Sequence, residues 1–126
     1  MSVRSFYQSF KYAIEGFVYC VRTQRNMRIH LTAAVFVLLC SFFLRLKAFE
    51  LMVLILTISL VFICEMFNTA IEKAVDVATG EFHPFAKAAK DVAAGAVLVS
   101  AVNSVIMGYL LFANKLLPLL AKYIRP

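Results

Sequence analysis

The sequence lacks tryptophan and contains only four glycines, three prolines and three cysteines in 126 residues. The glycines lie too far apart to form a GxxxxGK(S/T) phosphate-binding loop or a GxGxxG dinucleotide motif. The HRD and DFG motifs of protein kinases are also absent. Cys20, Cys40 and Cys64 have no metal-binding spacing, so we interpret them as small buried hydrophobic side chains. The N-terminus has no apolar core followed by a cleavage site, and we expect no secretory signal.

Apolar residues dominate the composition. They make up 63% of the chain, against about 45–50% in soluble domains, and the mean hydropathy is +0.85. The net charge is +6, but five of the 13 basic residues precede residue 29 and five of the seven acidic residues lie between 65 and 91. This separation is typical of a membrane protein with a localised acidic site, and it does not indicate nucleic-acid binding.

The apolar pattern predicts an all-α membrane protein, a helical bundle in a single domain of residues 1–126. An amphipathic surface helix is expected at about residues 3–22, where it lies in the headgroup plane or packs on other helices. Three transmembrane helices are expected at about residues 29–46, 49–77 and 88–114, followed by a short amphipathic tail. Glycine and proline in the segment TGEFHP mark the loop between the last two helices.

The basic residues predict the orientation of these spans. Five of them lie near the N-terminus, whereas the turn at residues 45–50 carries two. The positive-inside rule therefore predicts a cytoplasmic N-terminus. With three spans, the acidic segment 65–91 then also faces the cytoplasm.

The segment EMFNTAIEKAVD carries polar groups directly after 14 residues without charge, Leu51 to Cys64. Four of its side chains follow at steps of three, four and four, which places them on one helix face: Glu65, Asn68, Glu72 and Asp76. Each ionised side chain near the bilayer centre costs about 2.5–3.5 kcal/mol on insertion scales. These side chains must therefore face protein, water or a metal ion rather than lipid tails.

Two interpretations of this acidic face stay open. The carboxylates either pair with nearby lysines and arginines and only hold a bundle together, or they bind a divalent cation. Carboxylate and amide oxygens are hard donors that suit Mg²⁺. Lys90 and Asp91 open the following helix, where a lysine and free backbone N–H groups suit a phosphate. The second interpretation predicts phosphate chemistry on a lipid headgroup.

EMFNTAIEKAVD followed by EFHPFAKAAKDVAAGAV resembles the prokaryotic diacylglycerol kinase/undecaprenol kinase family of small integral-membrane kinases, from about Phe6 to Leu111. The resemblance implies a homotrimer in the bacterial cell (inner) membrane, with active sites shared between subunits. It implies transfer of the ATP γ-phosphoryl group to a lipid hydroxyl with Mg²⁺. The RNMRIH segment resembles a branch whose members often act on undecaprenol, so undecaprenol is the favoured lipid and diacylglycerol the next.

The resemblance also implies roles for single residues. Glu65 would be the general base that takes the hydroxyl proton, and Asn68 would position the reacting groups. Glu72 would bind Mg²⁺, with Asp76 in support. Contacts to the nucleotide are implied for six further residues: Tyr12, Glu81, Phe82, His83, Lys90 and Asp91.

One position departs from the family pattern. The family commonly has a glutamate, a second metal ligand, where this chain has Gln24. An amide oxygen can still bind Mg²⁺ but brings no charge. His30, at the membrane boundary, is interpreted as a structural residue.

Two other functions compete with the kinase: a small proton or cation transport subunit that uses the acidic face, and a purely structural membrane oligomer. A transport path needs polar groups through the full membrane depth. Between Leu51 and Cys64 only Thr57 and Ser59 are polar. This favours a site at the membrane surface.

Overall fold

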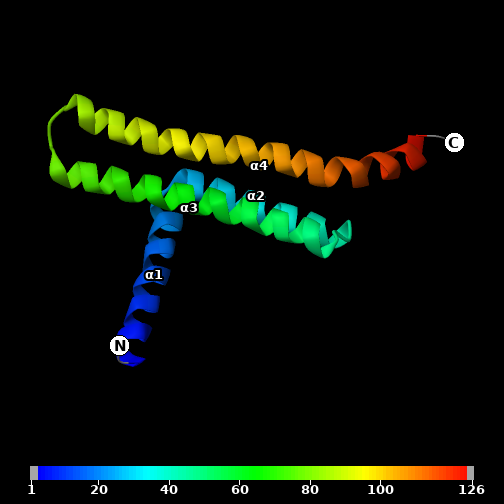
Figure 1. Ribbon diagram of the computed structural model, residues 1–126, viewed down its shortest axis with the longest axis horizontal. Coiled ribbons are helices and arrows are strands. Elements are labelled where there is room, and N and C mark those ends of the chain that lie inside the picture. Colours follow the sequence, from blue (N-terminus) through cyan, green and yellow to red (C-terminus); the bar gives the residue numbers. More distant parts are fainter. Residues whose placement is uncertain (1–2, 125–126) are drawn as a thin grey trace.

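The computed structural model describes residues 3–124 and contains four helices and no strand within that range (Figure 1). Helix α1 spans Val3–Thr23, α2 spans Arg25–Phe43, α3 spans Ala48–Ala78 and α4 spans Pro84–Ile124. Residues 1, 2, 125 and 126 of the predicted domain lie outside the described residues. The chain is all-helical, as predicted.

Local chemistry explains where the helices begin and end. Gln24 has an extended backbone (φ −99°, ψ 122°) that separates α1 from α2. The turn after α2 contains Arg45 with a φ of 50°. The backbone N–H of Lys47 then donates to Glu50 Oε2 at 2.6 Å and caps α3. Pro84 starts α4, at a position where its missing N–H costs nothing.

Two helices differ from the ranges expected from the sequence. α2 begins at Arg25, four residues before the predicted start, and α4 continues without a break to Ile124 rather than ending near residue 114. Lys115, just after the end of the predicted span, forms an ion pair, with its Nζ 2.9 Å from Glu50 Oε2. The charge is thereby paired without ending the helix. Pro118 lies inside α4, which bends toward its C-terminal end (Figure 1).

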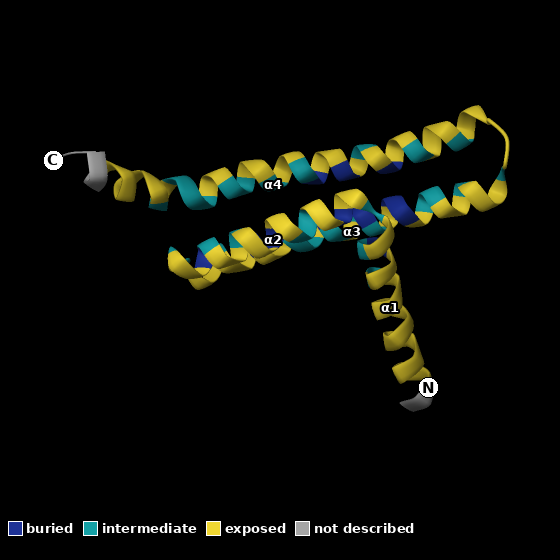
Figure 2. Ribbon diagram, turned by 180° about the vertical axis from the view of Figure 1, so that it is seen from behind, coloured by how far each residue is buried: buried dark blue, intermediate teal, exposed yellow. Residues whose placement is uncertain are grey.

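α2, α3 and α4 form a bundle in which α3 contacts each of the other helices. α1 leaves this bundle at a steep angle (Figure 1). By length and composition, three helices could cross a membrane: Arg25–Phe43, Ala48–Ala78 and Pro84–Ala121. Most of their apolar side chains are exposed (Figure 2). That exposure suits contact with lipid or with further protein.

The core of the bundle is narrow and contains small or polar residues. Buried residues lie on α2 and on the sides of α3 and α4 that face each other (Figure 2). On α4 they are Ala93, Val97 and Ser100. The Ser100 hydroxyl donates to the carbonyl of Val97 at 2.8 Å, so it is satisfied within its own helix. Small residues at such positions let two membrane helices approach closely.

We predict that Ser100→Leu lowers the stability of the bundle by about 1–3 kcal/mol, because the larger side chain has no room between α3 and α4. Thermal unfolding in detergent micelles measures the effect. Ser100→Ala is the control, since it removes the hydroxyl and keeps the small volume. Stability of the leucine variant equal to that of the alanine variant would contradict this account of the packing.

Candidate active site

Glu65 and Asn68 are buried polar side chains on α3, with 1% and 7% of their surface exposed. Val61, Glu65 and Asn68 follow at helical spacing, so the packing that buries Val61 also turns the two polar groups inward. Carboxylates are almost never fully buried unless they are paired. The burial of Glu65 therefore needs an explanation.

The hydrogen bonds of this pair are incomplete. Asn68 Nδ2 donates to Glu72 Oε1 at 3.0 Å. Glu65 Oε2 and Asn68 Oδ1 are buried and have no hydrogen-bond partner among residues 3–124. Each unpaired buried acceptor costs about 1–3 kcal/mol. Two of them on neighbouring turns of one helix indicate a place for a ligand that supplies hydrogen-bond donors or positive charge.

Glu65, Asn68 and Glu72 line an open groove of about 320 Å³. Residues of α2 form its second wall, with Asn26, Ile29 and His30. α4 contributes small and apolar side chains, among them Ala94, Val97 and Ala101. The groove thus has a polar wall on α3, a mixed wall on α2 and an apolar wall on α4, which suits a ligand with a polar head and an apolar body.

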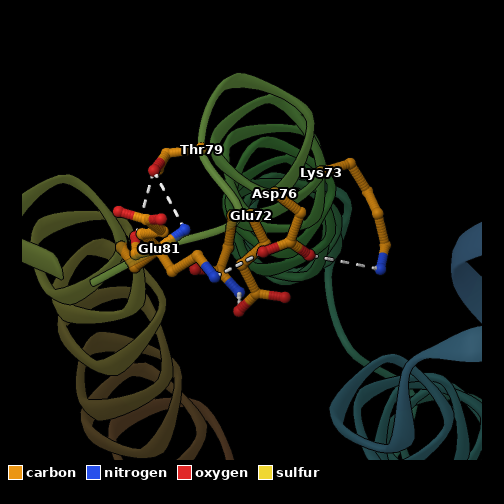
Figure 3. Close-up of polar contacts among 7 residues, drawn as sticks. Glu72, Lys73, Asp76, Thr79 and Glu81 are labelled. Carbon is orange, nitrogen blue, oxygen red and sulfur yellow. Dashed lines mark hydrogen bonds and ion pairs between the residues drawn. The ribbon is translucent and has the colours of Figure 1, made fainter. Parts of the chain in front are cut away.

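Asp76 forms ion pairs with two lysines (Figure 3). Its Oδ1 accepts a hydrogen bond from Lys90 Nζ at 2.6 Å, and its Oδ2 lies 3.8 Å from Lys73 Nζ. Because Lys90 is on α4, this ion pair joins α3 and α4 near their connecting loop. Asp76 does not line the groove that contains Glu65. Its supporting role toward a metal ion stays a prediction.

Five of the six residues predicted to contact a nucleotide line a second pocket, of about 370 Å³, beside the α3–α4 loop. They are Glu81, Phe82, His83, Lys90 and Asp91. The loop is held by Thr79, whose hydroxyl donates to the carbonyl of Glu81 at 3.0 Å (Figure 3). Lys87 lines the same pocket and forms an ion pair with Asp91. The pocket therefore brings two lysines to one place, as a phosphate site requires.

The two remaining predicted residues lie apart from both pockets. Tyr12 is on α1 and 64% exposed. Gln24 is half-buried at the start of α2, and its side chain makes no capping hydrogen bond. Neither residue lines the groove or the loop pocket. Their roles stay predictions.

Three residues of these pockets had no functional role in the sequence-based prediction. Asn26 and His30 line the groove, and Lys87 lines the loop pocket. Asn26 and His30 are four residues apart in RNMRIH, which places them on one face of α2. That spacing is the signal in the sequence that could have identified Asn26 and His30 as neighbours in a site.

The oxygen donors of the groove suit a Mg²⁺ ion that is also bound by phosphates and water. Among residues 3–124 no group of three or more His, Cys, Asp or Glu side chains is placed to hold a metal ion. Mg²⁺ is commonly held by one or two carboxylates together with substrate phosphates and water. Glu72, with the unpaired oxygens of Glu65 and Asn68 nearby, matches that arrangement. The site thus suits a cation that arrives with a nucleotide rather than one fixed by protein ligands alone.

Comparison with known proteins agrees with this chemistry. The sequence pattern of the family described as prokaryotic diacylglycerol kinase matches residues 11–112. The undecaprenol kinase of Bacillus subtilis (strain 168) is 49% identical over 111 residues, which cover 88% of this chain and 90% of that protein. A diacylglycerol kinase of Synechocystis sp. is 47% identical over 113 residues, 89% of this chain and 65% of that protein. The chain belongs to the prokaryotic diacylglycerol kinase family, a family of membrane lipid kinases.

Proposed function

We propose that this protein transfers the γ-phosphoryl group of ATP to the hydroxyl of a membrane lipid, with undecaprenol favoured and diacylglycerol next. The observation that carries the proposal is the buried carboxylate of Glu65, whose Oε2 has no partner among the described residues and which lines a groove with Asn68 and Glu72. A carboxylate held without a cationic partner is suited to accept a proton.

The reaction would proceed as an in-line displacement. The lipid hydroxyl oxygen attacks the γ-phosphorus of ATP, the bond from that phosphorus to the β–γ bridging oxygen breaks, and ADP leaves. Glu65 takes the hydroxyl proton. Asn68 uses its unpaired Oδ1 to orient the reacting groups. Such positioning supplies most of the catalysis in phosphoryl transfer.

Glu72 would hold Mg²⁺, which neutralises charge on the phosphates when it is bound. Asn68 already donates to Glu72 Oε1 and so fixes the direction of that carboxylate. Gln24 and Asp76 are further candidates for this cation.

The loop pocket would bind the nucleotide. Lys87 and Lys90 are now paired with Asp91 and Asp76, and phosphate oxygens would compete for their ammonium groups. Glu81, Phe82 and His83 complete the pocket wall. Tyr12 would contact the nucleotide from α1.

The assembled form would be a homotrimer with sites shared between subunits. Two observations support this: the described residues hold no group of three or more His, Cys, Asp or Glu side chains for a metal ion, and large apolar side chains are exposed on every spanning helix. α1 would lie at the membrane surface, where its exposed Phe6, Tyr7 and Phe10 enter the headgroup region. The N-terminus and the active site would face the cytoplasm at the bacterial cell (inner) membrane.

Undecaprenol is favoured on the strength of the comparison. The chain covers 90% of the undecaprenol kinase of Bacillus subtilis but 65% of the diacylglycerol kinase of Synechocystis sp.. A transport function finds less support, because the hydroxyl of buried Thr57 donates to the carbonyl of Val53 at 2.8 Å and leaves no free donor there for a proton path.

We predict that Glu65→Gln lowers turnover about 10²–10⁴-fold, since glutamine keeps the shape of the side chain but cannot take the proton. The measurement is transfer of labelled phosphate from ATP to lipid in detergent micelles, with thermal unfolding to check that the fold is kept.

Glu15→Gln provides the matched control, because Glu15 is exposed on α1 and pairs only loosely with Lys11, at 3.8 Å. Native turnover is expected for this control. If Glu65→Gln is equally active, Glu65 is not the base.

For Glu72→Gln we expect the Mg²⁺ concentration at half-maximal activity to rise about tenfold or more, because one negative charge facing the cation is lost. Titration of activity with Mg²⁺ at saturating lipid measures this shift. An unchanged Mg²⁺ dependence together with reduced turnover would assign Glu72 to another role.

A side-by-side assay with undecaprenol and diacylglycerol, each with MgATP, tests the substrate. We expect a higher kcat/KM for undecaprenol. A higher value for diacylglycerol would reverse the assignment but keep the lipid kinase, whereas phosphorylation of neither lipid would reject the proposed function.

A further inference from the structure

A second, apolar cavity lies directly beside the groove of Glu65. It encloses about 100 Å³ between α2, α3 and α4 and is lined mostly by apolar side chains, among them Val37, Leu54, Val61 and Phe62. Its lining on α3 extends from Phe62 back to Leu54, eight residues or about 12 Å of helix. The cavity therefore begins one turn from Glu65 and runs into the apolar part of the bundle.

His30 is the residue that the two spaces share. It lines the apolar cavity together with Thr57, and it lines the polar groove together with Glu65 and Asn68. The side chain is half-buried, and no hydrogen bond or ion pair of its imidazole occurs among residues 3–124. An imidazole can donate one hydrogen bond and accept another. His30 thus presents an unused polar group at the boundary between a polar and an apolar space.

We propose that His30 and this cavity form the subsite that selects the lipid alcohol. His30 forms a hydrogen bond with the lipid hydroxyl at the edge of the groove and so holds it within reach of the Glu65 carboxylate. The carbons next to that hydroxyl enter the cavity. The inference rests on the proposed kinase function and adds to it the residue and the space that recognise the substrate.

The size of the cavity favours a single slender chain. At about 100 Å³ the cavity is much smaller than the adjoining groove, which has about 320 Å³. A polyprenol carries one apolar chain directly behind its hydroxyl, and the first carbons of that chain fit such a space. A diacylglycerol carries an ester-substituted glycerol behind its hydroxyl, which is wider and forks into two chains.

The polar groups of the cavity point to the same substrate. The Thr57 hydroxyl donates to the carbonyl of Val53 at 2.8 Å, and the Ser104 hydroxyl donates to the carbonyl of Ala101 at 2.8 Å. Both donors are used within their own helices. Ester carbonyls placed in the cavity would find no free hydroxyl donor there and would lose their hydrogen bonds to water. The hydrocarbon next to a polyprenol hydroxyl makes no hydrogen bonds to water, so it loses none on entering the cavity.

Gly108 offers a direct way to fill the cavity. It lines the cavity on α4, and a Cβ at this position would meet no atom within 4 Å. Gly108→Leu therefore adds a large side chain at the wall of the cavity without a clash at its Cβ. Gly16→Leu is the matched control, because Gly16 is exposed on α1 and also has nothing within 4 Å of its Cβ.

The test measures kcat and KM for undecaprenol, diacylglycerol and ATP with the full-length protein in detergent micelles. We expect Gly108→Leu to lower kcat/KM for undecaprenol about tenfold or more while the KM for ATP stays native, and Gly16→Leu to behave as the native protein. We expect His30→Leu to raise the KM for undecaprenol about tenfold, the effect of one lost hydrogen bond. His30→Gln, which keeps a donor and an acceptor, should recover most of that loss.

A merely structural His30 would give a different pattern. His30→Leu and His30→Gln would then both lower thermal stability or raise the KM for lipid and ATP alike, and this result would overturn the proposal. Equal kinetics of the Gly108→Leu and Gly16→Leu variants would overturn it too. A native enzyme that prefers diacylglycerol also rejects this subsite but not the kinase. If the native protein phosphorylates neither lipid, the proposed function itself fails.

Discussion

The packing of this molecule depends on one constraint, a carboxylate that is buried without a positively charged partner. Glu65 is 1% exposed, and its Oε2 has no partner among residues 3–124. The lysines nearby in sequence are used elsewhere, since Lys90 and Lys73 pair with Asp76 and Lys87 pairs with Asp91. A bundle held together only by ion pairs would have directed one of these cations to Glu65. The arrangement instead leaves the carboxylate without a cation from the described residues.

The helix packing follows from that constraint. A polar group inside a membrane bundle needs close walls that exclude lipid, and α4 provides them with the small side chains of Ala93, Ala94 and Ser100. The charged contacts are kept at the two ends of α3, with Asp76–Lys90 beside one loop and Glu50–Lys115 beside the other turn. Between them, the buried polar side chains away from the groove are all hydroxyls: Ser41, Thr57, Thr69 and Ser100. The groove is therefore the one place in the described bundle where α3 turns ionisable groups inward.

The features that could be predicted best from the sequence are those that depend on the periodicity of one helix. The steps of three, four and four from Glu65 to Asp76 follow from helical periodicity alone, as does the inward direction of Glu65 and Asn68. Contacts between helices could not be predicted in this way. The pairing of Asp76 with Lys90 depends on how α4 returns along α3, and the shared position of His30 depends on where α2 packs against α3. Tyr12 and Gln24 were assigned by resemblance, and the contacts within one chain place neither of them at the site.

The position of the two spaces beside His30 also fits the base role that we propose for the buried Glu65. A lipid alcohol keeps its hydroxyl near water and its chain in hydrocarbon, so an enzyme can reach the hydroxyl only where these two environments meet. A carboxylate on the exposed side of that boundary would be hydrated and ion-paired, as Asp76 is. A carboxylate deeper in the apolar run would have no access to a nucleotide that arrives from water. Glu65 directly follows the 14 residues without charge and precedes the charged end of α3, so in the proposed mechanism it stands where the lipid and the nucleotide would meet.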